Sequence, residues 1–62
     1  KEDSLLDQIQ KLPQKYREVL YLYYYEEYSV AQIADLLDIS VGNVTTRLNR
    51  ARKKLEKSLR EV

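Results

Sequence analysis

Two serine residues, Ser29 and Ser40, constrain the fold of this 62-residue chain more than any other feature. Serine is a favoured helix N-cap, and each of these serines precedes apolar residues at helical spacing. The first apolar stripe consists of Val30, Ile33, Ala34 and Leu37. About three residues separate the two helices, and helices joined so closely must cross at a steep angle. The sequence therefore predicts a helix-turn-helix unit over residues 29–55.

The turn between these helices has its own sequence features. Asp38 lies where such motifs usually have glycine, at a position that needs a positive φ. Aspartate tolerates that conformation better than most other residues, at some energetic cost. Ala34 supplies the small side chain that crossing helices need where they approach most closely, and Ile39 is expected to pack beside it. These features support the unit independently of the caps.

The remainder of the chain is predicted to be helical as well. Gly42 and Pro13 are the only glycine and proline. Ser4 is expected to cap a first helix, which Pro13 ends, and a second helix is expected to run to about Tyr25. The apolar face of the first helix consists of Leu5, Leu6, Ile9 and Leu12. The apolar face of the second consists of Tyr16, Val19, Leu20, Tyr23 and Tyr24.

The last helix carries one continuous apolar seam, formed by Val44, Leu48, Ala51, Leu55, Leu59 and Val62. We expect this seam to cover the first two helices, with self-association as the alternative. The predicted fold class is all-α. It is a four-helix domain with a helix-turn-helix, related to the winged-helix DNA-binding class but without the wing. Residues 1–62 are expected to form one domain.

Composition excludes several function classes. The chain has no cysteine or histidine, so neither a disulfide nor a thiolate or imidazole metal site is available. It has no glycine-rich phosphate loop, and its carboxylates are scattered, so we expect no enzyme, no cofactor and no small-molecule substrate. No apolar run has the length of a membrane span. Because the first residue is Lys1 and not methionine, we expect a fragment of a larger protein.

The charges are distributed unevenly along the chain. Residues 1–46 contain eight acidic and four basic residues, for a net charge of −4, whereas residues 47–62 contain seven basic and two acidic residues, for a net charge of +5. This asymmetry indicates that the final segment faces a polyanion. The alternative is a solvated helix face, which describes most charge runs.

The second helix of such a unit lies in the major groove of DNA, and its first turns meet the base edges. Arginine pairs with guanine, asparagine with adenine, and threonine contacts the thymine methyl group. The residues predicted to read bases are Thr45, Thr46, Arg47 and Asn49, which are expected to face away from the seam. The residues predicted to contact phosphates are Ser40, Asn43, Arg50, Arg52, Lys53 and Lys54. Alternatively, the threonines are simply exposed helix residues.

Tyrosines crowd the end of the second helix, at Tyr21, Tyr23, Tyr24, Tyr25 and Tyr28. They are too many for one buried face. Exposed aromatic clusters are typical of protein interfaces, whereas buried tyrosines pack with the hydroxyl hydrogen-bonded. We predict a protein-partner surface at Tyr21, Tyr23 and Tyr24, with ordinary packing as the alternative.

Residues 12–55, LPQKYREVLYLYYYEEYSVAQIADLLDISVGNVTTRLNRARKKL, resemble region 4 of bacterial sigma factors, particularly the extracytoplasmic-function group. The resemblance implies a bacterial cytoplasmic four-helix domain that binds the −35 promoter element and the flap of the RNA polymerase β subunit. It also implies regulation by an anti-sigma protein. By position, Thr45, Thr46 and Asn49 match the base-reading residues of the family. Arg47, Arg50 and Lys53 match its basic residues near the DNA backbone.

This chain departs from the family pattern at three positions. Glu27 and Asp38 replace usual glycines, and Thr45 stands where a basic residue is common. Two other functions remain open beside promoter reading. One is the DNA-binding output domain of a response regulator, against which the closing RLNRARKKL argues. The other is an interaction-only module that binds polymerase or an anti-sigma protein but no promoter.

Overall fold

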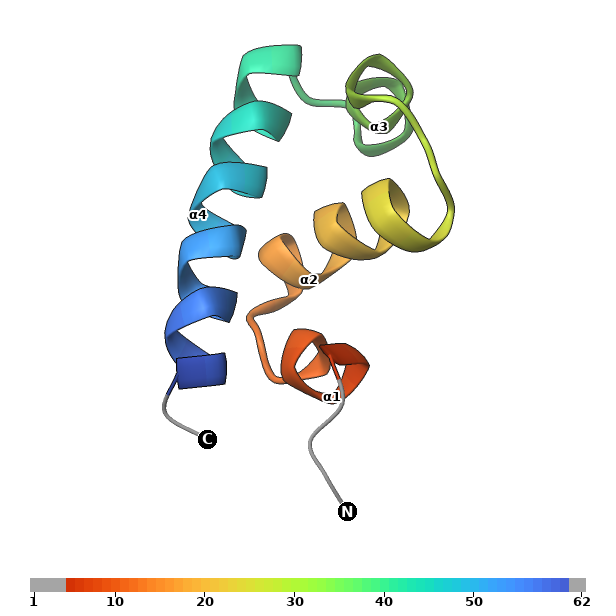
Figure 1. The fold of residues 1–62 in the computed structure, drawn as a ribbon. Helices are drawn as coiled ribbons and strands as arrows, with labels where there is room; N and C mark the ends of the chain where they lie inside the picture. Colours follow the sequence, from red (N-terminus) through yellow and green to blue (C-terminus); the bar gives the residue numbers. More distant parts are fainter. Residues whose placement is uncertain (1–4, 61–62) are drawn as a thin grey trace.

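The computed structural model describes residues 5–60, with only the backbone of Leu5, and consists of four α-helices, one of which continues into a π-helix (Figure 1). The elements are α1 (Leu5–Gln10), α2 (Gln14–Leu20), the π-helix η1 (Tyr21–Tyr25), α3 (Val30–Leu37) and α4 (Val41–Arg60). The predicted all-α class is confirmed, and no strand that could form a wing occurs within residues 5–60. In the same part of the chain, no helix is both long and apolar enough to cross a membrane.

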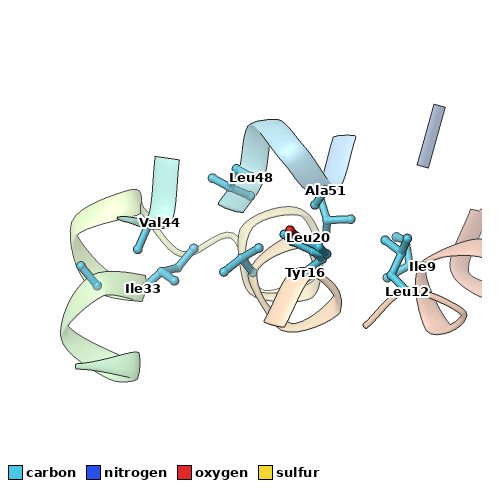
Figure 2. Packing of buried hydrophobic residues seen from close by; sticks show 10 residues of the cluster. Ile9, Leu12, Tyr16, Leu20, Ile33, Val44, Leu48 and Ala51 are labelled. Carbon is cyan, nitrogen blue, oxygen red and sulfur yellow. The ribbon is translucent and has the colours of Figure 1, made fainter. Parts of the chain in front are cut away.

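A single hydrophobic core joins the four helices. Figure 2 shows it as a row of side chains, with Ile33 and Val44 near one end and Ile9 and Leu12 at the other. The buried residues are Ile9, Leu12, Tyr16, Val19, Leu20, Ile33, Ala34, Val44, Leu48 and Ala51. The seam of α4 packs on α2 and α1, as predicted, so its buried part is used within the chain.

The seam is shorter than the sequence pattern predicted. Leu55 is half-buried and packs at the edge of the core, but the side chain of Leu59 is 43% exposed. Val62 lies outside the described residues. Leu59 lines a pocket together with Ile9 of α1, and this open space leaves the Leu59 side chain accessible.

The helix-turn-helix forms as predicted. The Ser29 hydroxyl accepts a hydrogen bond from the Gln32 backbone amide (3.1 Å), and the Gln32 side chain accepts one from the Ser29 amide (2.8 Å). This reciprocal capping box satisfies two amides at the start of α3. Asp38 ends α3 in the left-handed conformation, with φ 58°, as expected for a position where glycine is usual. Figure 1 shows α3 nearly end-on beside the long axis of α4, so the two helices cross steeply.

The second helix differs from its prediction after Leu20. The sequence pattern predicted an α-helix to about Tyr25, whereas residues Tyr21–Tyr25 form a π-helix, in which the Glu26 amide bonds to the Tyr21 carbonyl (3.2 Å). Each such bond spans five residues and not four, so the turn holds an extra residue. The side chains that follow are therefore rotated relative to α-helical spacing. Tyr24, predicted on the buried face, is 51% exposed.

The π-helix ends at Glu27, which has φ 60° in the left-handed region. The Tyr28 amide then donates to the Leu22 carbonyl (3.0 Å), which closes the end of η1. A non-glycine residue in this region stores strain, of order 1 kcal/mol or more. Glu27 and Asp38 thus each occupy a glycine-type conformation without glycine.

The first helix forms, but its apolar face is narrower than predicted. Ile9 is buried in α1, whereas Leu6 is 38% exposed, and Leu12 is buried from the connection after the helix. The predicted cap Ser4 lies outside the described residues. Pro13 occupies the N-cap of α2, where its fixed φ of −54° begins the helix and its missing amide costs no hydrogen bond.

Candidate nucleic-acid interface

The outer face of α4 carries exposed polar and basic side chains. The helix places Val44, Leu48 and Ala51 in the core, so residues half a turn away point to solvent. The exposed residues on this side include Thr46, Asn49, Arg50 and Lys53. They form a polar and basic surface on one side of a single helix. The major groove of B-DNA is wide enough to admit an α-helix. The structure thus brings together four of the residues predicted from the sequence.

At the start of α4, the side chains are already engaged with the backbone. The Ser40 hydroxyl accepts from the Asn43 backbone amide (3.0 Å), which confirms Ser40 as the N-cap. The Thr45 hydroxyl donates to the Val41 carbonyl (3.1 Å), one turn earlier. This bond leaves the methyl group and the oxygen lone pairs of Thr45 for a base. Ser40 therefore contributes chiefly to the geometry of the helix start.

Arg47 is not placed as the sequence analysis predicted. It was expected to face away from the seam, but it lies on the flank of α4 that packs against α2, half-buried. Its Nη1 is 3.9 Å from Oε2 of Glu18, and the two side chains are 24% and 33% exposed. The reason is helical periodicity, because Arg47 is three residues after the buried Val44 and four before the buried Ala51. The role of Arg47 in base reading remains a prediction.

Arg52 lies on the opposite flank, against the end of the second helix. Its Nε donates to the Tyr24 hydroxyl (2.8 Å), and its guanidinium carbon lies 5.7 Å from the ring centroids of both Tyr23 and Tyr24. Its Nη1 also donates to Oδ1 of Asn49 (3.2 Å). Two of its five N–H donors are therefore engaged within the protein, which leaves others for a phosphate.

The predicted partner tyrosines divide into exposed and half-buried members. Tyr21 and Tyr25 are 44% and 45% exposed, and their ring centroids are 5.3 Å apart. Tyr24 is also exposed, whereas Tyr23 packs partly against the core and meets Tyr24 edge to face at 5.0 Å. The exposed set, Tyr21, Tyr24 and Tyr25, is called the tyrosine surface below. Tyr23 contributes little area to it.

A pocket of about 430 Å³ adjoins the tyrosine surface. It lies between α1, the end of α2, η1 and the second half of α4, and its lining is mostly apolar. The lining residues are Ile9, Leu20, Tyr24, Tyr25, Arg52, Leu55, Glu56 and Leu59. Sequence reasoning identified the tyrosines but not this pocket, because its walls come from segments that are distant in the chain.

Comparison with known proteins gives consistent matches. The family model for sigma-70, region 4, matches residues 2–55. Over 60 residues the chain is 43% identical to the ECF RNA polymerase sigma factor SigW of Bacillus subtilis (strain 168), covering 97% of this chain and 32% of that protein. It is 36% identical over 59 residues to the RNA polymerase sigma factor YlaC of the same organism, covering 95% of this chain and 34% of that protein.

A third similarity lies outside the proteins named as sigma factors. The chain is 44% identical over 45 residues to a UPF0122 protein of Thermoanaerobacter sp. (strain X514), covering 73% of this chain and 38% of that protein. In all three cases the chain spans about a third of the length of the curated relative that it matches.

Proposed function

The chain belongs to the region 4 family of sigma-70 factors, and on that premise we propose that it reads the −35 element of bacterial promoters. A region 4 domain has a non-catalytic, DNA-binding role in transcription and interacts with RNA polymerase. The proposal adds the DNA element, the residues that read it and a site of action in the bacterial cytoplasm. The family membership also removes the response-regulator alternative.

The observation that carries the proposal is the outer face of α4. Thr46, Asn49, Arg50 and Lys53 are exposed together on the second helix of a helix-turn-helix, opposite the buried seam. This helix enters the major groove in DNA-binding proteins of this kind. Thr45, Thr46 and Asn49 would read bases, and Arg47 would do so only after leaving Glu18. Arg50, Arg52, Lys53 and Lys54 would hold the phosphates, with Ser40 and Asn43 at the helix start.

We also propose that the tyrosine surface and the adjoining pocket receive a protein partner. An exposed aromatic cluster beside an apolar pocket is typical of an interface whose central contacts are buried on binding. The proposed occupant is an apolar segment of the flap of the polymerase β subunit. An anti-sigma protein would compete for the same surface. Tyr24 of the tyrosine surface is hydrogen-bonded to Arg52 of α4, so the two proposed surfaces adjoin at Arg52.

The division between base reading and phosphate binding gives a testable pattern. Replacing Thr46 or Asn49 by alanine should weaken binding to the preferred sequence by about tenfold while leaving binding to random DNA nearly unchanged. Lys53→Ala should weaken binding to both by a similar factor, because phosphates are the same in every sequence. Fluorescence anisotropy with one selected duplex and one scrambled duplex measures both ratios.

Lys11→Ala is the matched control for this experiment, because Lys11 is an exposed lysine in the turn after α1 and not on α4. It removes the same charge as Lys53→Ala and should change neither affinity by more than about twofold, since distant surface charges are screened. Equal losses on both duplexes for the Thr46, Asn49 and Lys53 variants would contradict the division.

The partner surface is tested with two residues that line the pocket and that are neither hydrogen-bonded to Arg52 nor in ring contact with it. Tyr25→Ala combined with Leu59→Ala should weaken binding to isolated β flap by about tenfold or more, as expected for buried aromatic anchors. Leu36→Ala is the control, because Leu36 is 57% exposed on α3 and does not line the pocket. Flap binding that survives the double substitution in a folded domain would refute this part of the proposal.

A further inference from the structure

The side chain of Arg52 connects the tyrosine cluster to Asn49. Arg52 donates through Nε to the Tyr24 hydroxyl at 2.8 Å and through Nη1 to Oδ1 of Asn49 at 3.2 Å. Its guanidinium also lies 5.7 Å from the centroids of the Tyr23 and Tyr24 rings, within the range of a cation–π contact. Three neighbours therefore fix the plane and position of this guanidinium, although Arg52 itself is exposed.

The contact with Arg52 determines which end of the Asn49 amide faces outward. A guanidinium only donates hydrogen bonds, so the amide atom beside it must be the oxygen, which accepts. The amide nitrogen Nδ2 is then the other end, and it makes no hydrogen bond to any residue in the part of the chain that the structure describes. Nδ2 is a donor only. Asn49 consequently offers a donor to the DNA in the free protein.

We propose that Tyr24 and Arg52 are positioning residues that hold the Asn49 amide with Nδ2 toward the base, so that the base must present an acceptor. This inference rests on the proposed base-reading role of Asn49. In the major groove, guanine presents N7 and O6, adenine presents N7 and thymine presents O4, whereas cytosine presents only its N4 donor. The base opposite Asn49 is therefore any base except cytosine.

An unrestrained asparagine would not make this distinction. If the amide is free to turn by half a rotation, its oxygen meets the N4 donor of cytosine as readily as its nitrogen meets an acceptor. The selectivity thus depends on the hydroxyl of Tyr24 and on the forked guanidinium of Arg52, neither of which touches the base. One exposed hydrogen bond from a mobile arginine would restrain the Asn49 amide only weakly. Here the rings of Tyr23 and Tyr24 and the Tyr24 hydroxyl hold Arg52 in place, and Arg52 in turn holds the amide.

The test compares base preference in conservative variants. Tyr24→Phe removes the hydroxyl and keeps the ring, and Arg52→Lys keeps the charge but loses the planar fork that bonds two partners. Asn49→Ala first identifies the contacted base pair, as the position where its preference disappears. At that position, cytosine should weaken binding of the unsubstituted domain by about tenfold. In Tyr24→Phe and in Arg52→Lys the same substitution should cost only about two- to threefold.

Tyr21→Phe is the control, since it removes a hydroxyl from the same π-helix without touching Arg52, and it should keep the tenfold penalty. Thermal melting of each variant verifies folding. The NMR signals of the Asn49 side-chain NH₂ should shift in Tyr24→Phe but not in Tyr21→Phe, even without DNA.

Three results would overturn the inference. In the first, Asn49→Ala relaxes the preference while Tyr24→Phe and Arg52→Lys retain it, so the positioning fails and the base-reading role survives. In the second, all variants lose affinity equally for every base. In the third, Asn49→Ala changes no preference, so the base-reading role of Asn49 fails as well.

Discussion

Replacing Leu20 by alanine is expected to remove about half of the free energy of unfolding of this domain. Leu20 is the last residue of α2. Its side chain is fully buried at the centre of the core, beside the seam of α4 (Figure 2). Truncating a buried leucine costs about 2–5 kcal/mol, through lost burial and the cavity that remains. A domain of this length has a free energy of unfolding of only about 3–9 kcal/mol. Leu20→Ala therefore removes about half of the stability or more.

The measurement is thermal unfolding followed by circular dichroism at 222 nm. Since about 1 kcal/mol shifts the Tm of a domain this small by roughly 4–8 °C, the Tm should fall by at least about 8 °C. Leu36→Ala makes the same chemical change at an exposed position of α3 and should alter stability by no more than about 0.5 kcal/mol. Equal melting of the two variants would show that the core is not where the structure places it.

The affinity for DNA is expected to fall by about 100-fold when the salt concentration rises from 50 to 200 mM. Each protein–phosphate contact releases condensed counterions, so the logarithm of the affinity falls with the logarithm of salt at about 0.9 per contact. Four phosphate contacts are proposed, all from exposed side chains on α4: Arg50, Arg52, Lys53 and Lys54. Four contacts give a slope of about −3.6 and hence the expected loss.

The slope itself is measured by anisotropy titrations of one duplex at four or more salt concentrations. Lys53→Ala should reduce its magnitude by about 1, whereas Lys11→Ala should leave it unchanged. A slope near zero, or a slope that Lys53→Ala leaves intact, would favour the interaction-only alternative. That alternative predicts little DNA binding at any moderate salt concentration.

Most of the fold could be predicted because its signals are local. The Ser29 and Ser40 caps, the left-handed Asp38 and the α4 seam are set by residues within one or two turns of each other. The π-helix could not be predicted in this way. Its wider turn rotates the side chains that follow, and α-helical spacing therefore gave the wrong buried face for Tyr24.

The candidate site was predictable in part, for a similar reason. The exposure of Thr46, Asn49 and Lys53 depends on the α4 periodicity alone. The bond between Arg52 and Tyr24 joins residues 28 positions apart, so only the packing of η1 against α4 brings them together. The ion pair between Arg47 and Glu18 likewise joins two helices, so the sequence of α4 alone did not indicate the partner of Arg47.

The central claim is that α4 of this domain reads promoter DNA, and amide NMR titration tests it most directly. A ¹⁵N-labelled domain is titrated with a pool of short random duplexes at low salt, and the titration is repeated at higher salt. Our account predicts shifts concentrated between residues 40 and 54 that fade as salt is raised. If the signals of α4 do not respond to the duplexes at low salt, the isolated domain does not read DNA through this helix, and the account is wrong.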